Sequence, residues 1–102
     1  MKRVLVPLAV GFEEAEFIGI ADVLKRASAM SGNLELIIAS LDSELWVKGA
    51  NGICIKAECS LESVDTKSLD VIALPGGFDG MNNLKNNDTI ISIIKKLHNE
   101  KK

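Results

Sequence analysis

Short apolar stretches alternate with longer amphipathic stretches along the whole chain. Three of the apolar stretches are rich in β-branched residues and show little polar alternation: Arg3–Leu8, Leu34–Ser40 and Leu69–Leu74. Such stretches are typical of strands that are covered on both faces, as in a parallel sheet. The first one extends back by one residue, so we expect the first strand over Lys2–Leu8.

Two amphipathic stretches predict the helices between and after these strands. The first covers Glu13–Ser31 and is followed by Gly32 and Asn33, which end helices readily. The second covers Asp88–Glu100, where isoleucine and leucine recur at helical spacing. The order of strands and helices predicts an α/β fold with a doubly wound parallel sheet.

A further pair of short stretches predicts a hairpin before the third parallel strand. Leu45–Lys48 and Ile53–Lys56 flank the sequence Gly-Ala-Asn-Gly, which favours a tight turn. The third strand is then expected at the edge of the sheet, with unpaired backbone groups. Residues 1–102 therefore resemble an unfinished domain that stops where another strand should begin.

Composition narrows the class of protein. The chain has 102 residues, of which 47% are hydrophobic, and 12 Lys and Arg against 14 Asp and Glu give a formal net charge of -2. This allows one small domain. Three Phe, one Trp and no Tyr offer no stacking platform, so we expect no nucleic-acid binding. The longest uncharged apolar stretch, Val4–Phe12, is far shorter than the ~20 residues that span a bilayer, so we expect no membrane insertion.

The first residues imitate a secretory leader, because Met1–Arg3 carries positive charge and an apolar stretch follows. Pro7 interrupts that stretch and a helical pattern comes next, which favours a first strand instead. Cys54 and Cys59, with a single histidine, are too few for a zinc site or a disulfide framework. We therefore expect a chain of the reducing cytoplasm without a metal site.

The loop after the first strand is the first candidate for chemistry, because parallel sheets bind ligands at the carboxyl ends of their strands. It has one glycine and three carboxylates, unlike a phosphate-binding or dinucleotide-binding loop. A helical wheel places Glu16 on the apolar side, one turn before Ile20. Burial and the charge of Glu13 would favour its protonated form, which suits a hydrogen-bond donor or general acid. The alternative, which we prefer for Glu13 and Glu14, is a solvated carboxylate that stabilises the helix N-terminus.

The second candidate is the segment Leu74–Gly77, at the carboxyl end of the third parallel strand. Gly76 and Gly77 allow a sharp backbone turn that aims N–H groups into a cleft, where they could stabilise an oxyanion. The alternative interpretation is an ordinary tight turn.

The two cysteines and the histidine are weaker candidates for a functional site. Cys54 lies in the hairpin and is interpreted as a core or interface residue. Cys59 precedes a turn and is expected to be half exposed, with a redox role unsupported by any charged partner. His98 lies in the last turn of the final helix and is interpreted as a solvated surface residue.

Several motifs together resemble the ThiJ/PfpI superfamily. They are GFEEAE after the first strand, a helix ending at Gly-Asn, the turn SLESV, and DVIALPGGFDG followed by an amphipathic helix. The resemblance covers all 102 residues and is closest to the branch that includes the parkinsonism-associated deglycase. It implies a flavodoxin-like α/β fold with an inserted hairpin, of which residues 1–102 are the N-terminal part.

The resemblance also implies roles for three residues. Glu16 corresponds to the glutamic acid that hydrogen-bonds the catalytic cysteine thiolate, and Gly76 and Gly77 correspond to backbone amides that face that cysteine. The nucleophile of the family lies at the end of the next strand, with a histidine further on. Neither Cys54 nor Cys59 aligns with the nucleophile, and His98 does not align with the histidine.

From this resemblance we expect a cysteine-dependent glyoxalase or deglycase that acts on reactive dicarbonyls or their glycated adducts. It implies no cofactor, a cytoplasmic location, a role in stress, and a homodimer that pairs near the hairpin. The alternative is a non-catalytic redox-stress chaperone or interaction protein. For residues 1–102 alone we expect no activity, because the nucleophile is missing.

Overall fold

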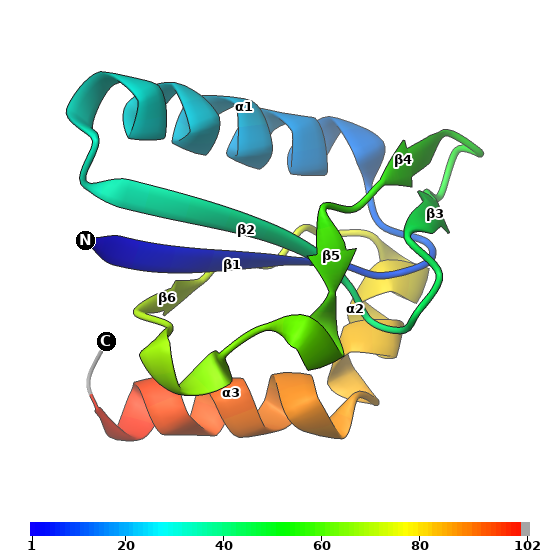
Figure 1. Ribbon diagram of the computed structural model, residues 1–102. Helices are drawn as coiled ribbons and strands as arrows, with labels where there is room; N and C mark the ends of the chain where they lie inside the picture. The colour runs from blue at the N-terminus through cyan, green and yellow to red at the C-terminus, as the bar shows by residue number, and fades with distance from the viewer. Residues whose placement is uncertain (101–102) are drawn as a thin grey trace.

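The computed structural model describes residues 1–100 and shows a sheet between helices (Figure 1). Its strands are β1 (Lys2–Leu8), β2 (Leu34–Ser40), β3 (Trp46–Lys48), β4 (Cys54–Lys56), β5 (Cys59–Ser60) and β6 (Val71–Ile72). Its helices are α1 (Glu14–Ser31), α2 (Phe78–Lys85) and α3 (Asp88–Asn99), and the short 3-10 helices η1 (Leu61–Ser63) and η2 (Thr66–Ser68) precede β6.

The central sheet is parallel, in the order β5-β2-β1-β6. β1 and β2 pair over their whole length, from Lys2 opposite Leu34 to Leu8 opposite Ser40. The chain proceeds outward from β1 to β2 and β5 and then crosses to β6, on the other side of β1. This confirms the doubly wound parallel sheet, with the inserted hairpin formed by β3 and β4.

Helices cover both faces of this sheet, α1 on one side and α3 on the other (Figure 1). Because successive residues of a strand point to opposite faces, β1 contributes to two cores. Val4 packs in one cluster with Phe17 of α1, and Leu5 packs in the other with Ile90 of α3. The burial on both faces explains why the strands are apolar without alternation.

The third predicted strand is present but shorter than expected. Only Val71–Ile72 is strand, although Asp70 N–H and Ala73 N–H still donate to β1 carbonyls at 2.8 and 2.9 Å. β6 pairs with β1 alone among the described strands, and Val71 is 42% exposed. The expected edge position of this strand is therefore confirmed.

The boundaries of α1 and α3 agree with the sequence within one residue, and besides the two 3-10 helices one strand and one α-helix were not predicted. Gly32 ends α1 in the left-handed conformation with φ 69°, and its N–H donates to the carbonyl of Ser28 at 3.0 Å. The unpredicted elements are β5, which is two residues long, and α2, which begins directly after Gly77. Gly80 permits the close approach of α2, since a Cβ there would lie 2.9 Å from Cα of Phe12.

Candidate functional site

The loop between β1 and α1 is fixed by hydrogen bonds to the hairpin and to the turn after β6. Gly11 N–H donates to the carbonyl of Lys48 at 2.9 Å, and Ala50 N–H donates to the carbonyl of Phe12 at 2.8 Å. On the other side, Glu13 N–H donates to the carbonyl of Gly76 at 2.9 Å. The first turn of α1 therefore lies between two glycine-containing turns that are distant in sequence.

Glu14, not Glu16, is the buried carboxylate of this turn. Glu14 is 5% exposed and forms the buried stripe of α1 with Phe17 and Ala21, whereas Glu16 is exposed. The predicted burial of Glu16 and the predicted solvation of Glu14 are both wrong. The helical wheel assumed that only the sheet covers α1, but the β3–β4 hairpin covers the first turn from another direction.

The turn of the hairpin wraps around the Glu14 carboxylate. Asn51 donates to it from its backbone N–H at 2.7 Å and from Nδ2 at 3.1 Å, and Ile53 N–H donates at 3.2 Å. Burial by itself would raise the pKa of this carboxyl. The hydrogen bonds from the N–H groups of Glu14, Ile53 and Asn51 and from the Asn51 side chain outweigh burial, and the pKa is lowered from 4.5.

Glu16 lies against the turn after β6. A Cβ added to Gly76 would overlap Oε2 of Glu16, so the absence of a side chain at Gly76 makes room for this carboxyl. Glu16 and Gly76, which are 60 positions apart, are therefore neighbours at the carboxyl end of the sheet.

Gly77 gives the turn its shape. Its φ of 102° is a conformation that side chains other than glycine rarely adopt, and a Cβ would lie 2.7 Å from the carbonyl oxygen of Gly11. The carbonyls of Gly76 and Gly77 accept hydrogen bonds from Glu13 and Met81. Within residues 1–100, the N–H groups of Gly76 and Gly77 have no hydrogen-bond acceptor, so they are available to a bound oxygen atom.

The cysteines and the histidine lie outside this site. Cys54 is exposed on β4, so it is not a core residue, while its interpretation as an interface residue stays a prediction. Cys59 is half buried on β5, with its Sγ 3.9 Å from the carbonyl oxygen of Ile38, and β2 and β1 lie between β5 and β6. His98 is exposed at the end of α3, as expected.

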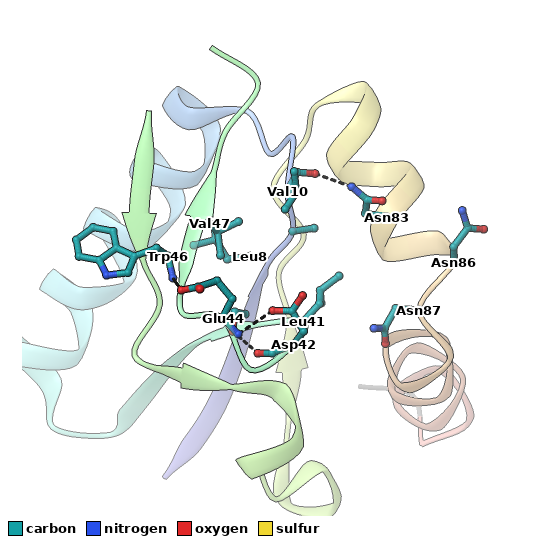
Figure 2. A pocket seen from close by; sticks show the side chains of 12 residues that line it. Leu8, Val10, Leu41, Asp42, Glu44, Trp46, Val47, Asn83, Asn86 and Asn87 are labelled. Atoms are coloured by element: carbon teal, nitrogen blue, oxygen red, sulfur yellow. Dashed lines mark hydrogen bonds between the residues drawn. The ribbon is translucent and has the colours of Figure 1, made fainter. Parts of the chain in front are cut away.

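A cavity of about 500 Å³ opens beside the carboxyl ends of β1 and β2 (Figure 2). One wall carries the carboxylates of Asp42 and Glu44, and the opposite wall carries asparagines of the α2–α3 region. Asn83 closes one end by donating from Nδ2 to the carbonyl of Val10 at 2.7 Å. The described lining contains no lysine or arginine, so the cavity is suited to neutral polar groups and not to anions.

In residues 1–100, no group of three His, Cys, Asp or Glu side chains is arranged to hold a metal ion together. The helices of the same described segment include none that is long and apolar enough to cross a membrane.

The fold and the geometry of the turn define the class of protein. It is a flavodoxin-like α/β protein with a glycine turn and a glutamate at the carboxyl end of its sheet. Residues 2–102 match the DJ-1/PfpI family. The chain belongs to this family.

Individual relatives agree with that assignment. The chain is 34% identical to Protein DJ-1 homolog B of Arabidopsis thaliana over 94 residues, which are 92% of this chain and 20% of that protein. It is 41% identical to Protein dj-1beta of Drosophila melanogaster over 81 residues, which are 79% of this chain and 41% of that protein. Among solved structures, oxidized Toxoplasma gondii DJ-1 superposes with a TM-score of 0.83 and 31% identity, covering 94% of this chain and 50% of that one. The chain thus spans half or less of each of these relatives.

Proposed function

We propose that this chain supplies the acidic and oxyanion-binding half of a cysteine-dependent site that acts on reactive dicarbonyls or their glycated adducts. In this proposal Glu16 faces the catalytic thiol, and the N–H groups of Gly76 and Gly77 bind the oxygen of the substrate. We propose as well that residues 1–102 are the N-terminal part of one ThiJ/PfpI-type domain, since the chain spans half or less of its relatives.

One observation carries the proposal: the Glu16 carboxyl lies against Gly76, beside N–H groups that have no acceptor within the described chain. Glu16 is exposed, so its carboxyl can be reached by a thiol that approaches the turn. In this proposal the carboxyl donates a hydrogen bond to the sulfur and stabilises the thiolate.

The chemistry follows from this arrangement. The thiolate attacks the aldehyde carbon of the dicarbonyl, a C–S bond forms, and the C=O electron pair moves to the oxygen. The amides of Gly76 and Gly77 stabilise the resulting oxyanion. The hydrogen of the former aldehyde carbon then leaves as a proton and a proton is added to the neighbouring carbon, so that a thioester forms, and water breaks the C–S bond and releases the thiolate. Overall, a 2-oxoaldehyde and water give a 2-hydroxy acid, in which one carbon is oxidised and its neighbour is reduced. This balance needs no external oxidant, reductant or organic cofactor.

The nucleophile itself belongs to neither cysteine of this chain in our proposal. Cys54 is exposed on β4, and Cys59 lies on β5 at the opposite edge of the sheet from β6. The thiolate would instead come from the end of a strand paired with the free side of β6. That placement puts it next to the turn of Gly76 and Gly77.

The second candidate function is that of a non-catalytic redox-stress chaperone or interaction protein. The hairpin favours it, because Trp46 and Ile53 are 59% and 56% exposed and Cys54 is exposed beside them. Apolar surface of this kind is typical of an interface, and a homodimer formed there in the cytoplasm is part of both proposals.

Consumption of methylglyoxal by the protein as its gene encodes it tests the proposed function. We expect turnover that falls on the order of 100-fold from wild type to Glu16→Leu, and the turnover of Glu16→Gln should lie between those of wild type and Glu16→Leu. We expect no turnover from residues 1–102 alone. Turnover by residues 1–102 that is lost in Cys54→Ser or Cys59→Ser would show that the nucleophile is assigned wrongly. Equal turnover in all Glu16 variants would show that Glu16 does not serve the reaction, and no turnover even in the wild type would favour the interaction protein.

A further inference from the structure

Glu14 has partners that a helix-end carboxylate does not need. Its carboxylate accepts from Asn51 N–H at 2.7 Å, Asn51 Nδ2 at 3.1 Å and Ile53 N–H at 3.2 Å, all from a turn more than 35 positions away. The side chain is nearly enclosed, with Glu14 5% exposed. A carboxylate that is used only for the helix dipole would remain in solvent.

The hairpin turn has the shape that this carboxylate requires. A Cβ on Gly49 would lie 2.5 Å from Cδ of Glu14 and 2.6 Å from its Oε2, and both atoms belong to a side chain already held by three hydrogen bonds. Gly52 has φ 87°, which turns the backbone so that Ile53 N–H reaches Oε2. Gly49 and Gly52 therefore allow the turn to close around the carboxylate.

This contact is continuous with the candidate site. Ala50, inside the same turn, donates to the carbonyl of Phe12, and Lys48, just before it, accepts from Gly11 N–H. The loop that contains Gly11 and Phe12 leads to Glu13, whose N–H donates to the carbonyl of Gly76. A single chain of hydrogen bonds thus links the hairpin turn, the first turn of α1 and the turn after β6.

No cation neutralises Glu14 among the described residues. The charged residues at this end of α1 are Glu16 and the preceding Glu13, and those on the hairpin strands are Lys48 of β3 and Lys56 of β4. The ion pairs of the described chain include none with Glu14. The turn is therefore held by N–H groups that require an acceptor, and an ionised carboxylate supplies the strongest one.

We propose that Glu14 is a positioning residue, whose ionised carboxylate closes the β3–β4 turn and through the β1–α1 loop holds Gly76 beside Glu16. The closure of the hairpin does not depend on the proposed function. Only the consequence at Glu16 and Gly76 depends on it.

The test is amide hydrogen exchange, measured by NMR on the folded chain at the N–H groups of Asn51 and Ile53. Both N–H groups donate to Oε2 of Glu14, while Asn51 Nδ2 donates to Oε1. In Glu14→Gln the amide oxygen can take the place of Oε2, but it is an uncharged and therefore weaker acceptor, and the NH2 group then faces the donor Asn51 Nδ2. We expect exchange at Asn51 and Ile53 at least tenfold faster in Glu14→Gln, with little change at the β1 core amides. The matched control is Glu13→Gln, which changes the neighbouring charge at the same helix end and should leave both amides protected.

Two further measurements keep the test decisive. In the unmodified chain, lowering the pH until Glu14 is protonated should release the same two amides before the β1 core, after correction for the intrinsic pH dependence of exchange. The amide resonance of Gly76 should shift in Glu14→Gln, which a contact confined to the hairpin would not cause. Unchanged protection of Asn51 and Ile53 at both pH values, or an equal loss in Glu13→Gln, overturns the proposal. Because no thiol reaction is measured, failure of the dicarbonyl chemistry would leave these results unaffected.

Discussion

Gly76 and Gly77 have different roles in the turn. Their substitution should therefore affect different properties, the stability of the fold for Gly77 and the position of the Glu16 carboxyl for Gly76. Alanine at Gly77 would have to adopt φ 102° with its Cβ 2.7 Å from a backbone oxygen, so we expect Gly77→Ala to lose about 1–3 kcal/mol of unfolding free energy. The atoms nearest to a Cβ at Gly76 are the carboxyl atoms of the Glu16 side chain. We expect Gly76→Ala to keep most of its stability but to move the Glu16 carboxyl.

Urea denaturation and the side-chain NMR signals of Glu16 measure these two effects. A loss of stability in Gly76→Ala as large as that in Gly77→Ala would contradict the assignment of Gly76 as room for Glu16. Gly19→Ala is the control, because a Cβ at Gly19 has no neighbour within 4 Å and alanine favours the helix.

Glu14 should also control how stability depends on acid. Its pKa in the folded chain lies below the ordinary value of 4.5, so the folded state favours the ionised form. The resulting stabilisation is complete above the pKa of the unfolded chain and is lost as the pH falls through the lower folded value. Glu14→Gln should therefore lower the urea midpoint at pH 7 and reduce the further drop between pH 5 and pH 3. An acid-induced drop of unchanged size in Glu14→Gln would contradict this account.

At the residue scale, the sequence motifs selected Glu16, Gly76 and Gly77 as candidates but did not show which carboxylate is buried. The structure places Glu16 beside Gly76, and the roles of these residues stay predictions. The buried position of Glu14 was missed, although its spacing to Phe17 and Ala21 follows the buried stripe of α1. That spacing, with the Gly-Ala-Asn-Gly turn, was a usable signal, but a helical wheel cannot show which neighbour covers which side.

At the element scale, the edge strand is the feature with the clearest consequence. β6 pairs with β1 alone in the described part of the chain, and Val71 is 42% exposed on it. An exposed strand edge favours pairing with another strand, and a charge on it opposes such pairing.

We therefore expect residues 1–102 to self-associate and Val71→Lys to weaken that association. Sedimentation velocity over a range of concentrations measures it. Met30→Lys is the control, because Met30 is 89% exposed at the end of α1, away from the sheet edge. A monomer at all concentrations, or an equal effect of both substitutions, would show that the β6 edge does not drive association.

The long elements were predictable and the short ones were not. The boundaries of α1 and α3 are specified locally, by Gly32 and by Asn87, whose side chain accepts from Ile90 N–H at 3.0 Å. β5 has two residues, and its pairing with β2 depends on where the chain returns after the hairpin. α2 depends on packing of Gly80 against Phe12, a contact between distant segments that no local pattern shows.

At the scale of the whole molecule, the doubly wound sheet brings distant segments to one edge. α1 begins at the carboxyl end of β1, and the turn of Gly76 and Gly77 begins at that of β6, the strand beside it. The crossover from β5 to β6 is therefore what makes Glu16 and Gly76 neighbours. Membership of the DJ-1/PfpI family agrees with this topology, and the proposed chemistry adds a thiolate on the far side of β6.

The most direct test of the central claim is the pH profile of thiol alkylation at the active-site cysteine of the protein as its gene encodes it. Wild type, Glu16→Leu and Glu16→Gln are compared, with Glu13→Gln as the control for charge at the helix end. If Glu16 donates a hydrogen bond to the thiolate, Glu16→Leu shifts the profile to higher pH, Glu16→Gln shifts it less, and Glu13→Gln leaves it in place. A profile that is the same in wild type and Glu16→Leu would contradict the claim and leave Glu16 as a surface charge.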